Sequence, residues 1–255
     1  MPGTRAEVER ALSLAGCVAP DDEADAILAA AAAGRGPVDD LVARRTRGEP
    51  LAWIVGGVTF GGRWIAVDPG VFVPRPRSAG LAARAAAALP ADGVAIDLCT
   101  GSGAVAAWIS AERPGARVVA SDIDLAAVAC ARRNGVEALE GDLFAPIPPA
   151  LHGLVDVVTA VTPYVPSDEL RLLPRDVRAF EPPLALDGGP AGTSVIDRAI
   201  DGAATWLAPG GTLFVECGPS QIGPVRRRAV AAGFAAIAVH AEEDGEERLV
   251  EARRR

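Results

Sequence analysis

The stretch AIDLCTGSGAVAAWI, residues 95–109, decides the fold. Its first residues form an apolar run that predicts a buried strand, and its last residues predict a helix. Gly101 and Gly103 stand in the turn between the two, where glycine lets the backbone approach a ligand closely. Because the first N–H groups of a helix have no partner within the helix, this turn can hold an anion. The stretch therefore predicts a strand, turn and helix at the ligand-binding end of an α/β fold.

Strand and helix patterns alternate along the rest of the chain. Further strands are predicted at residues 116–122, 136–142, 155–161 and 211–218, and further helices at 125–134, 193–207 and 220–232. This alternation predicts a parallel sheet with helices on both faces. Only the turn EEDGE, residues 242–246, separates two closing strands at 234–241 and 247–253, so we expect them to pair antiparallel. The predicted fold class is α/β, a mostly parallel Rossmann-like sheet with a C-terminal antiparallel hairpin, as in class I methyltransferases.

The segment before the sheet divides into two parts. Residues 1–50 show helical patterns throughout, beginning with Thr4 and Glu7 at capping-box spacing, and predict a small helical domain. Residues 51–76 contain a period-two pattern around Gly61 and Gly62, which predicts a linking β-hairpin. Residues 77–255 then form the main domain.

The composition narrows the function classes. A formal net charge of −8 argues against nucleic acid as a direct partner, because phosphate binding needs a basic surface. The four cysteines lack CxxC spacing and there are two histidines, so no metal site is expected. The sequence contains no run of 18 apolar residues and starts without an apolar signal region. We therefore expect a cytoplasmic protein without membrane association.

Three aspartates end three successive predicted strands. Asp97 ends the first and Asp122 the second, about twenty residues after the glycine turn, where an acid hydrogen-bonds ribose hydroxyls. Asp142 ends the third, where it can accept a hydrogen bond from an adenine amino group. S-adenosylmethionine fits this set, with its methionine carboxylate near the glycine turn, whereas a dinucleotide would want a third glycine where Ala106 stands. The predicted cofactor-binding residues are Asp97, Cys99, Thr100, Gly101, Ser102, Gly103, Asp122, Ile123, Asp142 and Leu143, with Asp124 expected only as a helix cap.

Several segments together resemble one family. They are GEPLAWIVGGVTFGGRWIAVDPGVFVPRPRS, DLCTGSGAVA, FEPPLALDGGPAGTSVIDRAI and ECGPSQIGPV. This set is similar to the HemK/PrmC-type N(5)-glutamine methyltransferases, which modify the Gly-Gly-Gln loop of peptide chain release factors. The resemblance covers nearly the whole chain. It implies S-adenosylmethionine as cofactor, a release factor or other protein as partner, and a substrate-binding role for the helical residues 1–50.

The chain departs from the family's pattern at positions that bear on catalysis. VTPY, residues 161–164, falls where the family carries Asn-Pro-Pro-Tyr, and Cys99 stands where glycine is usual. The segment PRPRSA places Arg77 and Ala79 where the family has acids. In the family's mechanism the Asn side chain and the next backbone carbonyl accept the two amide N–H bonds, which positions the nitrogen for attack on the sulfonium methyl.

Val161 offers no such acceptor. The predicted catalytic residues are Val161, Thr162, Pro163 and Tyr164, with Thr162 supplying its carbonyl or hydroxyl. A missing catalytic hydrogen bond costs about 10²–10³ in rate. Three readings stay open: a weakened or retuned glutamine methyltransferase, a methyltransferase for another acceptor such as a small molecule, or a silent S-adenosylmethionine-binding protein. His152 is considered as a base, and Glu181 as a residue facing the pocket.

Overall fold

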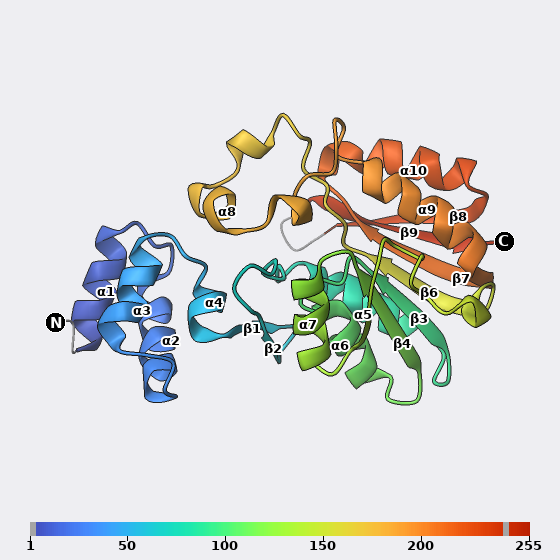
Figure 1. Ribbon diagram of the computed structural model, residues 1–255. Helices are drawn as coiled ribbons and strands as arrows, with labels where there is room; N and C mark the ends of the chain where they lie inside the picture. Colours follow the sequence, from blue (N-terminus) through green and yellow to red (C-terminus); the bar gives the residue numbers. More distant parts are fainter. Residues whose placement is uncertain (1–3, 242–244) are drawn as a thin grey trace.

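The computed structural model describes residues 4–241 and 245–255 of the chain and shows a helical N-terminal lobe beside an α/β body (Figure 1). The lobe consists of α1 (Arg5–Leu14), α2 (Pro20–Ala32) and α3 (Val38–Thr46). Thr4 caps α1 through the predicted capping box with Glu7. The lobe has its own apolar core, formed by Val8, Leu12, Ala24, Ile27, Ala30, Leu41, Val42 and Ile54.

A short helix and a hairpin connect the lobe to the body. Helix α4 (Leu51–Val55) precedes the hairpin of β1 (Gly57–Phe60) and β2 (Arg63–Ala66), which turns at Gly61 and Gly62 as predicted. Helix α4 was not anticipated, because five residues carry too little periodicity to show a helix. Its Ile54 belongs to the core of the lobe, while its Trp53 donates a hydrogen bond to the Val71 carbonyl (2.9 Å) on the side of the body.

The body is a seven-stranded sheet in the order β5-β4-β3-β6-β7-β9-β8. Strands β3 to β7 run parallel, and β9 pairs antiparallel with both β7 and β8. The strands are β3 (Val94–Leu98), β4 (Arg117–Asp122), β5 (Glu137–Glu140), β6 (Val155–Ala160), β7 (Leu207–Glu216), β8 (Phe234–Ala241) and β9 (Glu247–Arg254). The predicted fold class and final antiparallel pair are confirmed; residues 242–244 of the predicted EEDGE turn lie outside the described residues.

Helices cover both faces of the sheet. One face packs on α5 (Ser78–Ala88), α6 (Ala104–Glu112) and α7 (Leu125–Arg133), and the other packs on α9 (Ser194–Trp206) and α10 (Ile222–Ala231). Alternate strand residues enter the two cores: Ala95 and Val157 face the first set of helices, Ile96 and Val158 the second. Such period-two division is what buries both faces of a parallel sheet.

One long excursion leaves the sheet after β6, and we call residues 166–187 the lid segment. It contains α8 (Arg175–Phe180) and the short 3₁₀ turns Leu170–Leu172 and Pro183–Ala185; two others lie at Pro149–Leu151 and Pro219–Gln221. The excursion closes where the Val165 N–H donates to the Leu186 carbonyl (2.9 Å) and the Gly188 N–H donates to the Val165 carbonyl (2.9 Å). Among the described residues no helix is long and apolar enough to cross a membrane.

Candidate active site

A cavity of about 560 Å³ lies along the edge of the sheet where β3, β4, β5, β6 and β7 end. This is where ligands bind in open α/β sheets. Every predicted site residue except Asp97 and Gly103 lines the cavity. We call the part around the glycine turn, Asp122 and Asp142 its cofactor end, and the part around residues 161–164 its acceptor end.

Asp97, buried behind the glycine turn, fixes it by hydrogen bonds. Its carboxylate accepts hydrogen bonds from Thr100 Oγ1 (2.6 Å) and from Thr159 Oγ1 on β6 (2.6 Å), and also from the Ala106 N–H at the start of α6. Asp97 is 2% exposed, so it fixes the loop instead of facing the ligand space. Burial raises the pKa of this carboxyl to about 6, although its hydrogen bonds oppose the shift.

The backbone of the turn adopts the left-handed region at Gly101 (φ 56°) and Gly103 (φ 79°). Cys99 also has a positive φ, 54°, which costs a non-glycine residue about 1 kcal/mol or more. Burial raises the pKa of the Cys99 thiol far above its usual range, so the thiol stays protonated and is no nucleophile. The residue usual in the family, glycine, would fit this conformation without strain.

Asp122 closes the turn from the neighbouring strand. Its carboxylate accepts from the Gly101 N–H (2.8 Å) and from the Asp124 N–H (3.0 Å), and burial raises its pKa. Asp124 caps α7 by accepting from the Ala126 N–H (2.8 Å), as expected. The Asp122 carboxylate has further lone pairs that suit ribose hydroxyls.

The third predicted acid already has a partner. Asp142 forms an ion pair with Arg198 of α9, and both side chains are about half exposed at the edge of the cavity. Leu143, beside it, is the second described non-glycine residue with positive φ (48°). Ile123 is 54% exposed next to the cavity, so this apolar side chain is open to contact with a flat ligand.

Asn134 ties the cofactor end to the linking hairpin. Its Oδ1 accepts from the Ala66 N–H (2.9 Å), and its Nδ2 donates to the Ala66 carbonyl (2.8 Å) and the Ser102 carbonyl (2.8 Å). The sequence does not reveal this role, because the contacts join residues 68 and 32 positions apart. One amide side chain thus joins β2, the end of α7 and the glycine turn.

The VTPY stretch follows β6 directly and forms the wall of the acceptor end. Val161 is half-buried and packs against the core between the sheet and α5–α7. Thr162 is 3% exposed, and its Oγ1 has no hydrogen-bond partner among the described residues. The backbone after it is fixed by Gln221, whose Nε2 donates to the Tyr164 carbonyl (2.7 Å) and the Ala191 carbonyl (3.2 Å).

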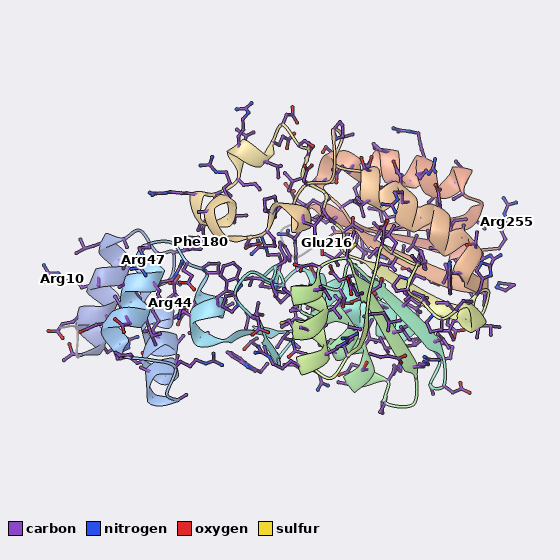
Figure 2. All side chains as sticks on the ribbon, in the orientation of Figure 1. Arg10, Arg44, Arg47, Phe180, Glu216 and Arg255 are labelled. Atoms are coloured by element: carbon purple, nitrogen blue, oxygen red, sulfur yellow. The ribbon has the colours of Figure 1, made fainter. Side chains whose placement is uncertain are left out.

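A polar cluster that the sequence did not reveal surrounds Glu216, the last residue of β7. Figure 2 labels Glu216 itself. Glu216 is 2% exposed and accepts from Ser78 Oγ (2.6 Å), Arg77 Nε (3.2 Å) and Tyr164 Oη (3.4 Å). Arg77 also donates from Nη2 to Tyr164 Oη. Burial raises the pKa of Tyr164, so the phenol is neutral at pH 7. Arg77, noted in the sequence as a departure, therefore belongs to the acceptor end.

The lid segment covers the acceptor end with apolar side chains, namely Leu173, Pro174, Val177, Pro182, Leu184, Ala185 and Leu186. Glu181 does not face this cavity. It is buried in an ion pair with Arg75 (2.8 Å), next to a second hollow of about 380 Å³ between the N-terminal lobe, the hairpin and α8. Arg75 and Val177 line both hollows, so the second adjoins the first.

The idea that His152 acts as a base is wrong. His152 follows the 3₁₀ turn before β6, whereas the cavity lies beyond the other end of that strand. Its ring packs against Trp206 with centroids 5.1 Å apart, and no histidine lines the cavity. The described residues also contain no group of acids, cysteines and histidines placed to hold a metal ion.

The residues present fit S-adenosylmethionine. Its ribose hydroxyls would meet Asp122, and its carboxylate would lie beside the glycine turn at the N-terminal end of α6. Ser102 Oγ, buried beside the turn, has no partner among the described residues and is free to bond a ligand. The sheet order, the glycine turn and this cavity define an S-adenosylmethionine-dependent methyltransferase of class I.

Comparison with known proteins supports this methyltransferase class and identifies a family within it. Residues 64–144 match the family model "Methyltransferase small domain". A methyltransferase structure from Pyrococcus furiosus shares the fold, with a TM-score of 0.53 and 19% identity over 74% of this chain and 87% of that one. A release factor glutamine methyltransferase of Mycobacterium leprae is 37% identical over 85% of this chain and 78% of its own length. The chain belongs to the family of release factor glutamine methyltransferases.

A second relative of the same name, from Mycolicibacterium smegmatis, is 43% identical over 70% of this chain. The match spans 65% of that relative's own length.

Proposed function

We propose that this chain transfers the methyl group of S-adenosylmethionine to the side-chain amide of a glutamine in a protein, with a peptide chain release factor as partner. The observation that carries the proposal is the single cavity that joins the glycine turn to the 161–164 stretch. The acceptor is inferred from the relatives, which are release factor glutamine methyltransferases. A partner that works in translation places the enzyme in the cytoplasm.

The three parts of the chain have separate roles in this proposal. Residues 1–50 dock the protein substrate, residues 51–76 link the lobe to the body, and residues 77–255 bind the cofactor and carry out the transfer. The hollow between the lobe, the hairpin and α8 supports this division, because it adjoins the acceptor end. We propose that the cofactor contacts Cys99 to Gly103, Asp122, Ile123, Asp142 and Leu143, all of which except Gly103 line the cavity, while Asp97 holds the glycine turn.

Catalysis here consists of positioning. The acceptor nitrogen must be held in line with the sulfonium methyl, and the Thr162 carbonyl supplies one acceptor for its N–H bonds. Pro163 fixes the backbone direction after β6, and Tyr164 anchors the wall through Arg77 and Glu216. Val161 cannot supply the second acceptor, so the transfer to glutamine is slow.

The test is a methyl-transfer assay on a purified release factor with labelled S-adenosylmethionine. Val161→Asn should raise the rate of glutamine methylation by about 10²–10³, because it restores one catalytic hydrogen bond. Calorimetric titration of S-adenosylmethionine serves as the control, since both proteins should bind it equally. Absence of cofactor binding would overturn the proposal, and an equal rate in both proteins would show that Val161 is not the weak point.

A further inference from the structure

The acceptor end has to bind both sides of a side-chain amide. A primary amide has N–H donors on its nitrogen and lone pairs on its carbonyl oxygen. In the proposed function the Thr162 carbonyl accepts an N–H, which leaves the amide oxygen without a partner. A buried carbonyl oxygen without a donor loses the hydrogen bonds that it made in water, and this weakens binding. A site that binds glutamine therefore needs a donor directed at the oxygen.

The hydroxyl groups at the acceptor end do not supply this donor. The Ser78 hydroxyl donates to Glu216 (2.6 Å), and the Tyr164 hydroxyl donates its hydrogen to the same carboxylate (3.4 Å). The Thr162 hydroxyl is buried within the protein, so it does not reach the ligand space. A side-chain donor for the amide oxygen must therefore come from an arginine.

Three arginines line the cavity, and two of them are directed elsewhere. Arg198 pairs with Asp142 at the cofactor end. Arg75 pairs with Glu181, which faces the second hollow. Arg77 lies at the acceptor end, and its side chain is 35% exposed there. Arg77 is therefore the arginine that can meet the acceptor.

The guanidinium of Arg77 is held in one orientation. Its Nε donates to Glu216 (3.2 Å), and its Nη2 donates to Tyr164 Oη. These two partners lie on different elements, since Glu216 ends β7 and Tyr164 follows β6. A guanidinium has five N–H groups. Those that remain on Arg77 have no hydrogen-bond partner within residues 4–241 and 245–255, so a donor already fixed in place is available to a ligand.

The charges that line the cavity favour a neutral acceptor. The acids among the lining residues are Asp122, Asp124, Asp142, Asp187 and Glu216, and the arginines are Arg75, Arg77 and Arg198. The acids outnumber the arginines even when the sulfonium of the cofactor is counted with the arginines, so a further anion would be repelled. The oxygen of an amide is a good acceptor without a full charge, so it fits the free N–H groups of Arg77.

We propose that Arg77 donates a hydrogen bond to the side-chain carbonyl oxygen of the acceptor glutamine and so directs its nitrogen at the sulfonium methyl. The inference rests on the proposed function and deepens it, because it adds a residue that recognises the amide. Val161 removes a contact on the nitrogen side of the amide, and Arg77 supplies one on the oxygen side.

The contact with Arg77 acts on binding. In the transfer, the nitrogen lone pair forms the bond to the methyl carbon while the carbon–sulfur bond breaks and leaves its electron pair on sulfur. The nitrogen then releases one N–H proton to water. The hydrogen bond from Arg77 to the oxygen is present before and during this step, so its loss should raise KM and leave kcat nearly unchanged.

A double-mutant cycle tests whether Arg77 contacts the acceptor amide. Wild-type enzyme and Arg77→Met, each loaded with S-adenosylhomocysteine, are titrated with a release factor that carries its Gly-Gly-Gln loop or a Gln→Met variant of that loop. Because a guanidinium has donors and no acceptor, it can bond the amide only through the oxygen. We expect the Gln-to-Met affinity ratio to fall about tenfold in Arg77→Met, the equivalent of about 1.4 kcal/mol. A general loosening of the site lowers both affinities alike and cancels in the ratio.

Two further variants complete the test. Arg77→Lys keeps a charged donor and should retain part of the affinity ratio. Arg63→Met removes a surface arginine paired with Glu112 and should leave the ratio at the wild-type value. Calorimetry with S-adenosylmethionine confirms that each variant is folded. In turnover with the native release factor, Arg77→Met should raise KM about tenfold, because slow transfer makes KM equal to Kd.

The outcomes separate the inference from the proposed function. An affinity ratio that is the same in wild type and Arg77→Met overturns the inference and leaves the proposed function standing. A ratio that falls equally in Arg77→Met and Arg63→Met is not specific to Arg77 and also overturns it. If S-adenosylmethionine binds but the native release factor is neither bound nor methylated, the proposed function fails and the inference fails with it.

Discussion

Asp97 shows how one buried carboxyl can make stability depend on pH. Its pKa in the folded protein is about 6, against 3.8 in the unfolded chain. The native state therefore binds this proton more tightly than the unfolded state. The stabilising contribution is complete below about pH 4 and is lost as the pH rises through about 6.

The prediction compares wild type with Asp97→Asn, which cannot titrate. Between pH 4 and pH 7 the unfolding free energy of the wild type should fall relative to the variant by up to about 3 kcal/mol. Urea unfolding at several pH values measures the difference in unfolding free energy. The contributions of the other acids cancel in this difference, because both proteins contain them. A difference that rises with pH would mean that the three donors around Asp97 outweigh its burial.

The residues at the site also show what sequence can reveal. Gly101 and Gly103 could be located from the sequence because they stand in the turn between a predicted strand and the next helix, and Asp122 because it ends the following predicted strand. The cluster around Glu216 was not, because Arg77 and Glu216 are 139 positions apart and meet only when the sheet has formed. Nor could the sequence place Asp97 beneath the turn, since that depends on its contact with Thr159 of a neighbouring strand.

At the scale of elements, the chain's one asparagine and one glutamine hold opposite ends of the cavity. Asn134 joins β2 to the glycine turn, and Gln221 joins the stretch after β6 to the loop before α9. Substitution of Asn134 should therefore affect cofactor binding, and substitution of Gln221 should affect the acceptor.

Asn134→Ala removes three hydrogen bonds at the cofactor end. It should lower the unfolding free energy by about 2–3 kcal/mol, at roughly 1 kcal/mol for each bond. The glycine turn loses its tie to the hairpin, so the Kd for S-adenosylmethionine should rise about tenfold. Calorimetry measures the affinity, and an unchanged Kd would show that Asp97 and Asp122 hold the turn without Asn134.

Gln221→Ala should loosen the acceptor end of the cavity. The Tyr164 carbonyl loses its partner, so kcat/KM for the protein acceptor should fall by about tenfold through poorer positioning. The Kd for S-adenosylmethionine should stay at the wild-type value. The same loss of cofactor affinity in both variants would contradict the division of the cavity into two ends.

Element prediction succeeded where the chain is periodic and failed where it is not. The strands β3 to β7 and their helices are predictable from alternation alone. Helix α4 and the lid segment are not, because they are short or rich in proline and their positions depend on contacts with distant residues such as Trp53 and Phe180. The lid segment is also what encloses the acceptor end.

At the scale of the whole molecule, Phe180 of α8 lies between the lobe and the body (Figure 2). Its ring stands edge-on to Trp53 with centroids 6.3 Å apart. It also approaches Gly48 so closely that a Cβ added there would stand 3.6 Å from the ring. The lid segment is thereby connected to the N-terminal lobe.

Phe180→Ala should weaken the hold of the lobe on the lid segment. We expect KM for a release factor to rise about tenfold, the equivalent of about 1.4 kcal/mol, with no change in the Kd for S-adenosylmethionine. Leu172→Ala, which trims a 65% exposed side chain of the same segment, is the control and should leave both constants unchanged. Equal behaviour of the two variants would show that the lobe does not act through α8.

The sheet order has a consequence for biosynthesis. Strand β9 lies inside the sheet, between β7 and β8, although it is the last strand to leave the ribosome. Until it emerges, β7 is an open edge, and open edges pair with other chains. Glu216, which faces Leu249 of β9, gains its backbone partner strand only then. A nascent chain stalled before residue 247 therefore exposes an unpaired strand beside an incomplete acceptor site, a state open to pairing with other chains.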